Sequence, residues 1–243
     1  CRKMTSALEW NKLKRTGFFP AFLAGGLLAA AAPVVNIGAR PESFVNKQDS
    51  PAVILMGANW QLMSMLLSFL LIIGACIMYH TEFADNAMQR MDTLPKRPES
   101  LFFGKCSVLL VLTAGALVLG GAALWFCGWK WFSADRIFTT EIWKSMGFSF
   151  AMFLPLLLCM TAVSSICKNM WISLGIGTIC LFMTSILQNG GGILSYLPFM
   201  MPMKVYPNLN GAQAVRCLII SCGETAGFGL LEIIYFKIRR HFT

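Results

Sequence analysis

Residues 50–81 read SPAVILMGANWQLMSMLLSFLLIIGACIMYHT and contain no Asp, Glu, Lys or Arg. A bilayer core is roughly 30 Å thick and needs about 20 apolar residues per helix, so this stretch is long enough to span a membrane. The whole chain has the same character, since 56% of its 243 residues are hydrophobic and only 13% are charged. That balance is far from the balance of a soluble domain. The sequence is that of a membrane protein.

Apolar runs of similar length occur on both sides of this stretch. The last run is interrupted only by Glu224 and Glu232, and we count it as a span. The fifth run is too long for one helix, and the glycines after Asn189 predict that its helix ends near Gln188. We therefore predict an all-α membrane protein with six transmembrane helices. The runs are Thr16–Ala39, Ser50–Thr81, Cys106–Trp129, Ser145–Cys167, Asn169–Met203 and Cys217–Phe236.

The distribution of Lys and Arg predicts the orientation of the chain in the membrane. With the N-terminus inside, 13 of these residues lie in inner segments and 7 in outer ones. The positive-inside rule then places both termini in the cytoplasm. The net charge of +9 is spread over these membrane flanks rather than gathered in one patch with interleaved aromatic residues. The charge therefore does not predict binding to nucleic acid.

Two glutamates interrupt the sixth span. An ionisable group near the middle of a bilayer costs roughly 2.5 to 3.5 kcal/mol, so the side chain of Glu224 should face protein or a water-filled cavity. A place on a substrate path and a structural, hydrogen-bonded carboxyl fit the sequence equally well. Glu232 lies close to the inner boundary, where it can reach water or Arg239, and we interpret it as structural.

Polar and small residues mark predicted contacts between spans. Asn59, Gln61, Ser64 and Ser68 give the second span a polar streak in its outer half. Side chains of this kind join transmembrane helices by hydrogen bonds, and we favour that interpretation over contact with a ligand.

Two small-residue motifs allow helices to approach closely. Gly223-x-x-x-Gly227, followed by Gly229, lies in the sixth span, and Ala116-x-x-x-Gly120 lies in the third. For both motifs we favour packing within the chain over a dimer interface.

The sequence contains no recognisable constellation of catalytic residues. The two histidines, His80 and His241, have no cysteine or carboxylate at metal-binding spacing, and the nine cysteines include no C-x-x-C pair. A phosphate loop is also missing, because Gly104-Lys105 lacks the preceding glycine of that motif and is followed by Cys106 instead of Ser or Thr. We therefore expect a chain that is not an enzyme and that holds no metal or cofactor.

The predicted cytoplasmic segment between the second and third spans, residues 80–105, reads HTEFADNAMQRMDTLPKRPESLFFGK. Apolar residues recur at helical spacing in its first half, with polar residues mainly on the other side. This pattern predicts a short amphipathic helix from about Glu82 to Met91, a break at Pro95, and a third helix opened by Pro98. The apolar stripe fits a partner protein and a lipid surface equally well.

This loop resembles the loop of ABC-2 type permeases. Those permeases have a glutamate, a leucine-proline break and a glycine-lysine around their coupling helix. Here Glu82 is followed by a helical stretch, Leu94-Pro95, Arg97 and Phe103-Gly104-Lys105. The segment Glu9–Arg15 resembles the basic segment that leads into the first span of the same family.

Two shorter motifs, Tyr79-His80-Thr81-Glu82 and Lys168-Asn169-Met170-Trp171, resemble the lantibiotic and bacteriocin self-protection branch of that family. The resemblance covers the whole chain in size and six-span layout. It implies one permease domain over residues 1–243, with a cytoplasmic N-terminal segment at 1–15 and a coupling-helix loop at 82–98.

The resemblance implies one half of an ATP-driven exporter in a bacterial cytoplasmic membrane. A separate ABC ATPase, carrying ATP and Mg²⁺, would push the coupling helix, and a second permease, identical or related, would complete the transporter. In the immunity branch the substrate would be an amphipathic antimicrobial peptide drawn from membrane lipid, with Asn59, Gln61 and Glu224 as candidates for its path. The residues implied to contact the ATPase are Asn86, Met88, Arg90, Met91, Asp92, Thr93, Leu94, Pro95 and Arg97.

Two alternatives stay open at this stage. One is an ABC-2 permease for another substrate, such as an ion, a lipid or a drug. The other is a stand-alone membrane channel or scaffold that works without an ATPase. The presence of an ATPase partner discriminates the second alternative from the others.

Overall fold

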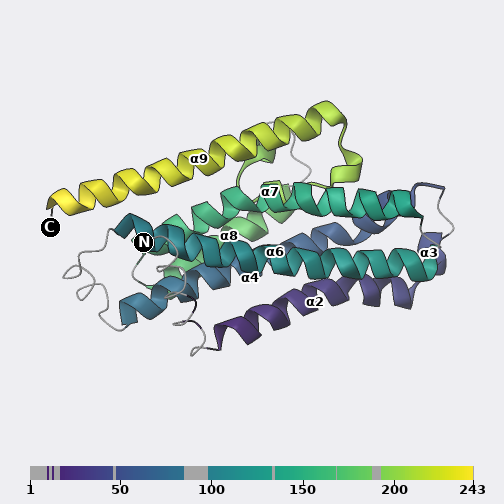
Figure 1. Ribbon diagram of the computed structural model, residues 1–243, viewed down its shortest axis with the longest axis horizontal. Helices are drawn as coiled ribbons and strands as arrows, with labels where there is room; N and C mark the ends of the chain where they lie inside the picture. The colour runs from purple at the N-terminus through teal and green to yellow at the C-terminus, as the bar shows by residue number, and fades with distance from the viewer. Residues whose placement is uncertain are drawn as a thin grey trace.

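The computed structural model describes residues 10, 13, 17–45, 48–84, 98–132, 135–167, 169–187 and 193–242. These residues form helices and connecting segments, without a strand. Figure 1 shows long helices lying side by side in an elongated bundle. The predicted all-α fold is confirmed.

The described residues include six helices that are long and apolar enough to cross a membrane, as predicted. These six are α2 (Phe18–Ala39), α4 (Pro51–Ala84), α6 (Pro98–Trp131), α7 (Arg136–Ile166), α8 (Met170–Leu187) and α9 (Gly211–Phe242). The shorter elements are α3 (Glu42–Val45) and the 3-10 helices η1 (Ile193–Tyr196), η2 (Met201–Met203) and η3 (Tyr206–Asn208).

The uncharged runs identified the spans but underestimated the lengths of three helices. Long charged side chains near a membrane surface can place their charged ends in water while the backbone stays helical. The helices that begin before the predicted runs are α6, at Pro98, α7, at Arg136, and α9, at Gly211. Pro98 opens α6 as predicted, and α8 ends at Leu187, next to the predicted end at Gln188.

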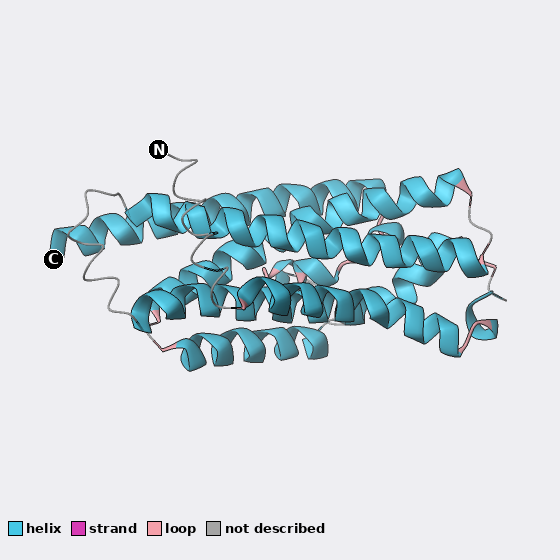
Figure 2. Cartoon of the chain, turned by 60° about the horizontal axis from the view of Figure 1, so that its bottom comes forward, coloured by secondary structure: helices cyan, strands magenta, loops and turns pink. Residues whose placement is uncertain are grey.

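The two ends of the bundle differ in what connects the helices. We call one end the hairpin end, because α4 finishes there at Ala84 and α6 begins there at Pro98. In Figure 1, α2 begins and α9 ends at the hairpin end, and Figure 2 marks the C-terminus at the same end. A cytoplasmic location for this end remains a prediction from the charges.

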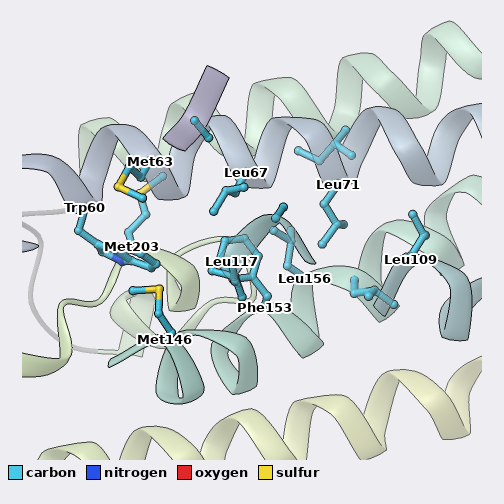
Figure 3. Packing of buried hydrophobic residues seen from close by; sticks show 14 of the residues in the cluster. Trp60, Met63, Leu67, Leu71, Leu109, Leu117, Met146, Phe153, Leu156 and Met203 are labelled. Carbon is cyan, nitrogen blue, oxygen red and sulfur yellow. The ribbon is translucent and has the colours of Figure 1, made fainter. Parts of the chain in front are cut away.

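The hydrophobic core is centred on α4, which packs against α2, α6, α7 and α8. Figure 3 shows its side chains meeting residues of α6, α7 and η2. Hydrophobic residues on several sides of α4 are buried. The labelled core residues are Trp60, Met63, Leu67 and Leu71 of α4, Leu109 and Leu117 of α6, Met146, Phe153 and Leu156 of α7, and Met203 of η2.

Helix α9 lies at the edge of the bundle, mainly against α7 (Figure 1). Only 17% of its most apolar stretch is buried inside the chain. It joins a second, smaller apolar cluster that is separate from the main core. The buried members of that cluster are Phe148 and Met152 of α7, Met201 of η2, and Ala214 and Cys217 of α9.

The two small-residue motifs have different outcomes. A methyl group at Gly26 of α2 would lie 3.4 Å from Cβ of Ala116 in α6, so packing of the third-span motif within the chain is confirmed. A methyl group at Gly223, Gly227 or Gly229 would meet no atom of the described residues within 4 Å. The prediction was therefore wrong for α9, because this helix turns its glycine face away from the bundle.

Candidate functional site

Asn59 of α4 joins two transmembrane helices. Its side chain is 3% exposed, and its Oδ1 accepts a hydrogen bond of 2.7 Å from Nδ2 of Asn36 in α2. Its own Nδ2 donates to the carbonyl oxygen of Leu55 at 2.9 Å. The favoured interpretation, hydrogen bonding between helices, is confirmed for this residue.

Gln61 and Glu224 are not brought to Asn59 by hydrogen bonds. Gln61 is exposed on α4, close to Asn59 in sequence but on another face of the helix. Glu224 lies on α9, which contacts α7 rather than the α2 side of the bundle. The three candidate path residues therefore do not form one hydrogen-bonded cluster within the described part of the chain.

Glu224 is a partly buried carboxyl with unused hydrogen-bonding capacity. Its Oε2 is enclosed and has no hydrogen-bond partner among the described residues. Lys204, in the segment between η2 and η3, interacts with it electrostatically. A carboxyl within a span, with a cation near it and an oxygen left free, can accept a hydrogen bond from a ligand.

A basic and aromatic cluster stands close to this carboxyl. Nζ of Lys204 lies 3.9 Å from the ring centroid of Tyr196 and 3.5 Å from Sγ of Cys217. The guanidinium carbon of Arg216 lies 5.3 Å from the same Tyr196 centroid. Cations at such distances over an aromatic ring are attracted by its quadrupole. Sequence reasoning missed this cluster, because Lys204 and Arg216 had been counted only as flanking charges.

The segment that carries Lys204 folds back into the bundle. Met201, Pro202 and Met203 are buried, and η2 contacts both α4 and α7. Nε1 of Trp60 in α4 donates a hydrogen bond of 3.0 Å to the carbonyl oxygen of Pro202, near Met203 in Figure 3. The sequence had predicted only a connecting segment between the fifth and sixth spans here.

At the hairpin end, Lys105 is buried where α6 leaves the connection to α4. Its side chain is only 1% exposed, and Nζ donates to the carbonyl oxygen of Met78 at 3.4 Å. The same atom lies 5.0 Å from the ring centroid of Tyr79. Lys105 therefore ties the start of α6 to the last turns of α4.

The predicted ATPase-contact residues lie outside the described residues. They fall between Asn86 and Arg97, and the predicted amphipathic helix is described only as far as Ala84, where α4 ends. The structure therefore describes the two helices on either side of the predicted contact.

Glu232 is buried and hydrogen-bonded, which supports its interpretation as a structural residue. Its Oε1 accepts a hydrogen bond of 2.5 Å from Oγ of Ser165 in α7. The access to water that the sequence allowed is not found, because the side chain is only 2% exposed and lies against the end of α7. The side chain of Arg239, the other expected partner, lies outside the described residues.

The described residues contain no group of three or more His, Cys, Asp or Glu side chains placed to hold a metal ion. The polar side chains described above instead form hydrogen bonds and electrostatic contacts between apolar helices.

The sequence matches the family described as ABC-2 family transporter protein over residues 7–185. The chain belongs to this family. The match runs from before α2 into the last turn of α8 and includes the connection between α4 and α6. No curated protein and no solved structure matches the chain. It is a member of the ABC-2 family with six apolar helices in the described part of the chain. It is therefore a multi-pass membrane protein and the permease subunit of an ABC transporter, a class that works with an ABC ATPase.

Proposed function

We propose that this ABC-2 permease is part of an exporter that expels an amphipathic antimicrobial peptide from a bacterial cytoplasmic membrane. Its role would be self-protection against a lantibiotic or bacteriocin. The observation that carries the transport part is the family match over residues 7–185, which includes the connection between α4 and α6. The peptide substrate is supported by the likeness of residues 79–82 and 168–171 to the self-protection branch.

Coupling to ATP would take place at the connection between α4 and α6. In this proposal the ATPase contacts residues 86–97 and displaces the hairpin end of the two helices. Lys105 supports such a role, because it is buried and bonded to Met78 at the place where the helices meet. A displacement of α6 would therefore be passed to α4 rather than absorbed in a loose connection.

A second permease subunit, identical or related, would complete the path. Of the three candidate path residues, Glu224 has the clearest capacity for a ligand, because its Oε2 has no partner among the described residues. Asn59 has both of its amide atoms engaged in bonds to Asn36 and Leu55. Its part in the proposed path would be to hold α2 against α4.

The partner is tested by affinity purification of the intact chain from its native membrane in mild detergent. We expect an ABC ATPase to accompany it, together with a second permease or a second copy of this chain. Mass spectrometry identifies the partners, and an unrelated membrane protein carrying the same tag is the control. Purification without an ATPase would contradict the coupling proposal.

The substrate is tested separately by the survival of cells exposed to lantibiotics. Cells that lack the chain should be killed at lower peptide concentrations than cells that contain it, with the ATPase present in both. Equal survival, although the ATPase copurifies, would assign the transporter to another substrate. The genes next to this one provide an independent check, since a neighbouring lantibiotic precursor would support the immunity role.

A further inference from the structure

In the half of α9 nearer the hairpin end, the described side chain that is buried against the bundle is a carboxyl. From Cys222 to Tyr235, Glu232 is the only buried residue. Its large apolar neighbours Leu230, Leu231 and Ile234 are exposed. This arrangement is the one expected in a membrane span, where apolar side chains face lipid and an ionisable side chain faces protein.

Among the described residues, the hydrogen-bond partner of this carboxyl is a hydroxyl at the end of α7. Oγ of Ser165 lies 2.5 Å from Oε1 of Glu232, and it also lies 2.8 Å from the carbonyl oxygen of Ala162. A hydrogen bond of this kind depends on distance and angle, so a small displacement of either helix breaks it. Apolar packing weakens more gradually, because it is non-directional.

The same contact lies beside the start of α6. Sγ of Cys106 is 3.6 Å from Oγ1 of Thr161, one turn before Ser165 on α7. Glu232 acts electrostatically on Cys106, and α6 contacts α9. The preceding residue, Lys105, is bonded to Met78. A series of contacts therefore leads from the C-terminal end of α4, through the first turns of α6, to Glu232.

At its other end α9 is attached in a different way. Ala214 and Cys217 belong to the apolar cluster with Met152. Oγ of Ser221 donates a hydrogen bond of 2.7 Å to the carbonyl oxygen of Ala151. Ser221 and Glu232 are about 16 Å apart along the helix. Helix α9 is thus attached to α7 by an apolar cluster at one end and by a polar contact at the other.

We propose that Glu232 is a positioning residue for transport, whose contact with Ser165 holds α9 against α7 and opens when the start of α6 is displaced. Helix α9 then swings about its attachment at Ser221. This inference rests on the proposed function, because it needs an ATPase that moves α6.

The test is a comparison of two cysteine cross-links in the complex purified with its ATPase. The first pair is Ser165→Cys with Glu232→Cys, and the control pair is Ala151→Cys with Ser221→Cys. Each complex is treated with a short homobifunctional methanethiosulfonate, without nucleotide and with ATP and vanadate. A linking reagent is needed because Cys is shorter than Glu and a direct disulfide requires Cβ atoms about 3.5–4.5 Å apart. Peptide mass spectrometry identifies the linked cysteines and so separates them from links to native ones.

We expect the first cross-link to form without nucleotide and to fall by about tenfold with ATP and vanadate, within the range of typical couplings between sites. The control cross-link should keep its yield in both states. Equal yields of the first cross-link in both states, or no cross-link at all, would overturn the inference. Absence of a copurifying ATPase would overturn the proposed function instead, and it is observed before any cross-linking.

A second measurement uses single substitutions and the rate of ATP hydrolysis by the purified complex. Glu232→Gln keeps an oxygen that can accept from Ser165, so it should retain the rate, whereas Glu232→Leu should lose most of it. Leu231→Ala, at the adjacent exposed position, is the matched control and should behave as the unaltered chain. A full rate for Glu232→Leu, or an equal loss for the Gln and Leu variants, would contradict a role in positioning.

Discussion

Single residues decide how the segment before α9 is held. Trp60 is fully buried, and its indole nitrogen binds the carbonyl oxygen of Pro202. A buried carbonyl within apolar surroundings needs a donor, and Trp supplies one together with a large apolar surface. One side chain of α4 therefore fixes the position of the buried residues Met201–Met203.

Replacing Trp60 with Phe should destabilise the chain by about 1–3 kcal/mol, because the carbonyl oxygen of Pro202 would be left without its donor. Thermal unfolding in detergent, followed by the helical circular dichroism signal, measures the effect. Trp125→Phe is the control, since Nε1 of Trp125 bonds Thr139 at an exposed position; its effect should stay within about 0.5 kcal/mol. Equal losses in both variants would argue against the bond to Pro202.

Oε2 of Glu224, which has no hydrogen-bond partner among the described residues, gives a prediction about transport. Glu224→Leu should abolish peptide resistance, because it removes both the charge and the acceptor, whereas Glu224→Gln should retain part of it. Leu230→Ala, at an exposed position of the same helix, should leave resistance unchanged. The amount of chain in the membrane must be equal in all three. Full resistance in both Glu224 variants would remove this residue from the proposed path.

At the scale of whole helices, the surroundings of the glycines show which helix faces are packed and which are exposed. A methyl group at Gly177 of α8 would lie 2.7 Å from Cγ2 of Ile72 in α4 and 2.7 Å from Cε of Met160 in α7. Such distances are shorter than van der Waals contact, so Gly177 allows three helices to meet. The glycines of α9 have no comparable neighbours within the described chain.

Gly177→Val should therefore lower stability by about 1–3 kcal/mol through overpacking. Gly227→Val introduces the same side chain on the open face of α9 and should leave the unfolding temperature of the monomer nearly unchanged. Thermal unfolding of both variants in detergent provides the comparison. A larger loss for Gly227→Val would show that its face is covered in the folded protein.

Coupling to the ATPase belongs to the scale of the whole molecule. The predicted amphipathic helix has Met91 on its apolar stripe and Gln89 on its polar side. Met91→Asp should abolish peptide resistance and reduce copurification of the ATPase, because a charge would enter the proposed contact. Gln89→Asp adds the same charge on the polar side and should be tolerated. Normal resistance in cells with Met91→Asp would favour a stripe that rests on lipid.

Much of this architecture could be predicted because lipid imposes a simple rule on sequence. A span must be apolar over about 20 residues, so six spans could be counted and the end of α8 near Gln188 located. Helix ends outside the hydrocarbon obey no such rule, which is why α7 begins well before the predicted Ser145. The sequence predicted that Asn59 forms a hydrogen bond to another helix, but it could not identify Asn36 as the partner. Which residues of different helices meet does not follow from their spacing in the sequence.

The sequence by itself determined the membrane location, the number of spans and the absence of a phosphate loop, because each follows from local composition or spacing. Only the tertiary structure decided which side chains meet. It placed Met201–Met203 inside the bundle, turned the glycines of α9 outward and buried Glu232 against Ser165. The physical reason is that a polar or small residue in a span has several possible partners, and the rotation and depth of every helix together select one.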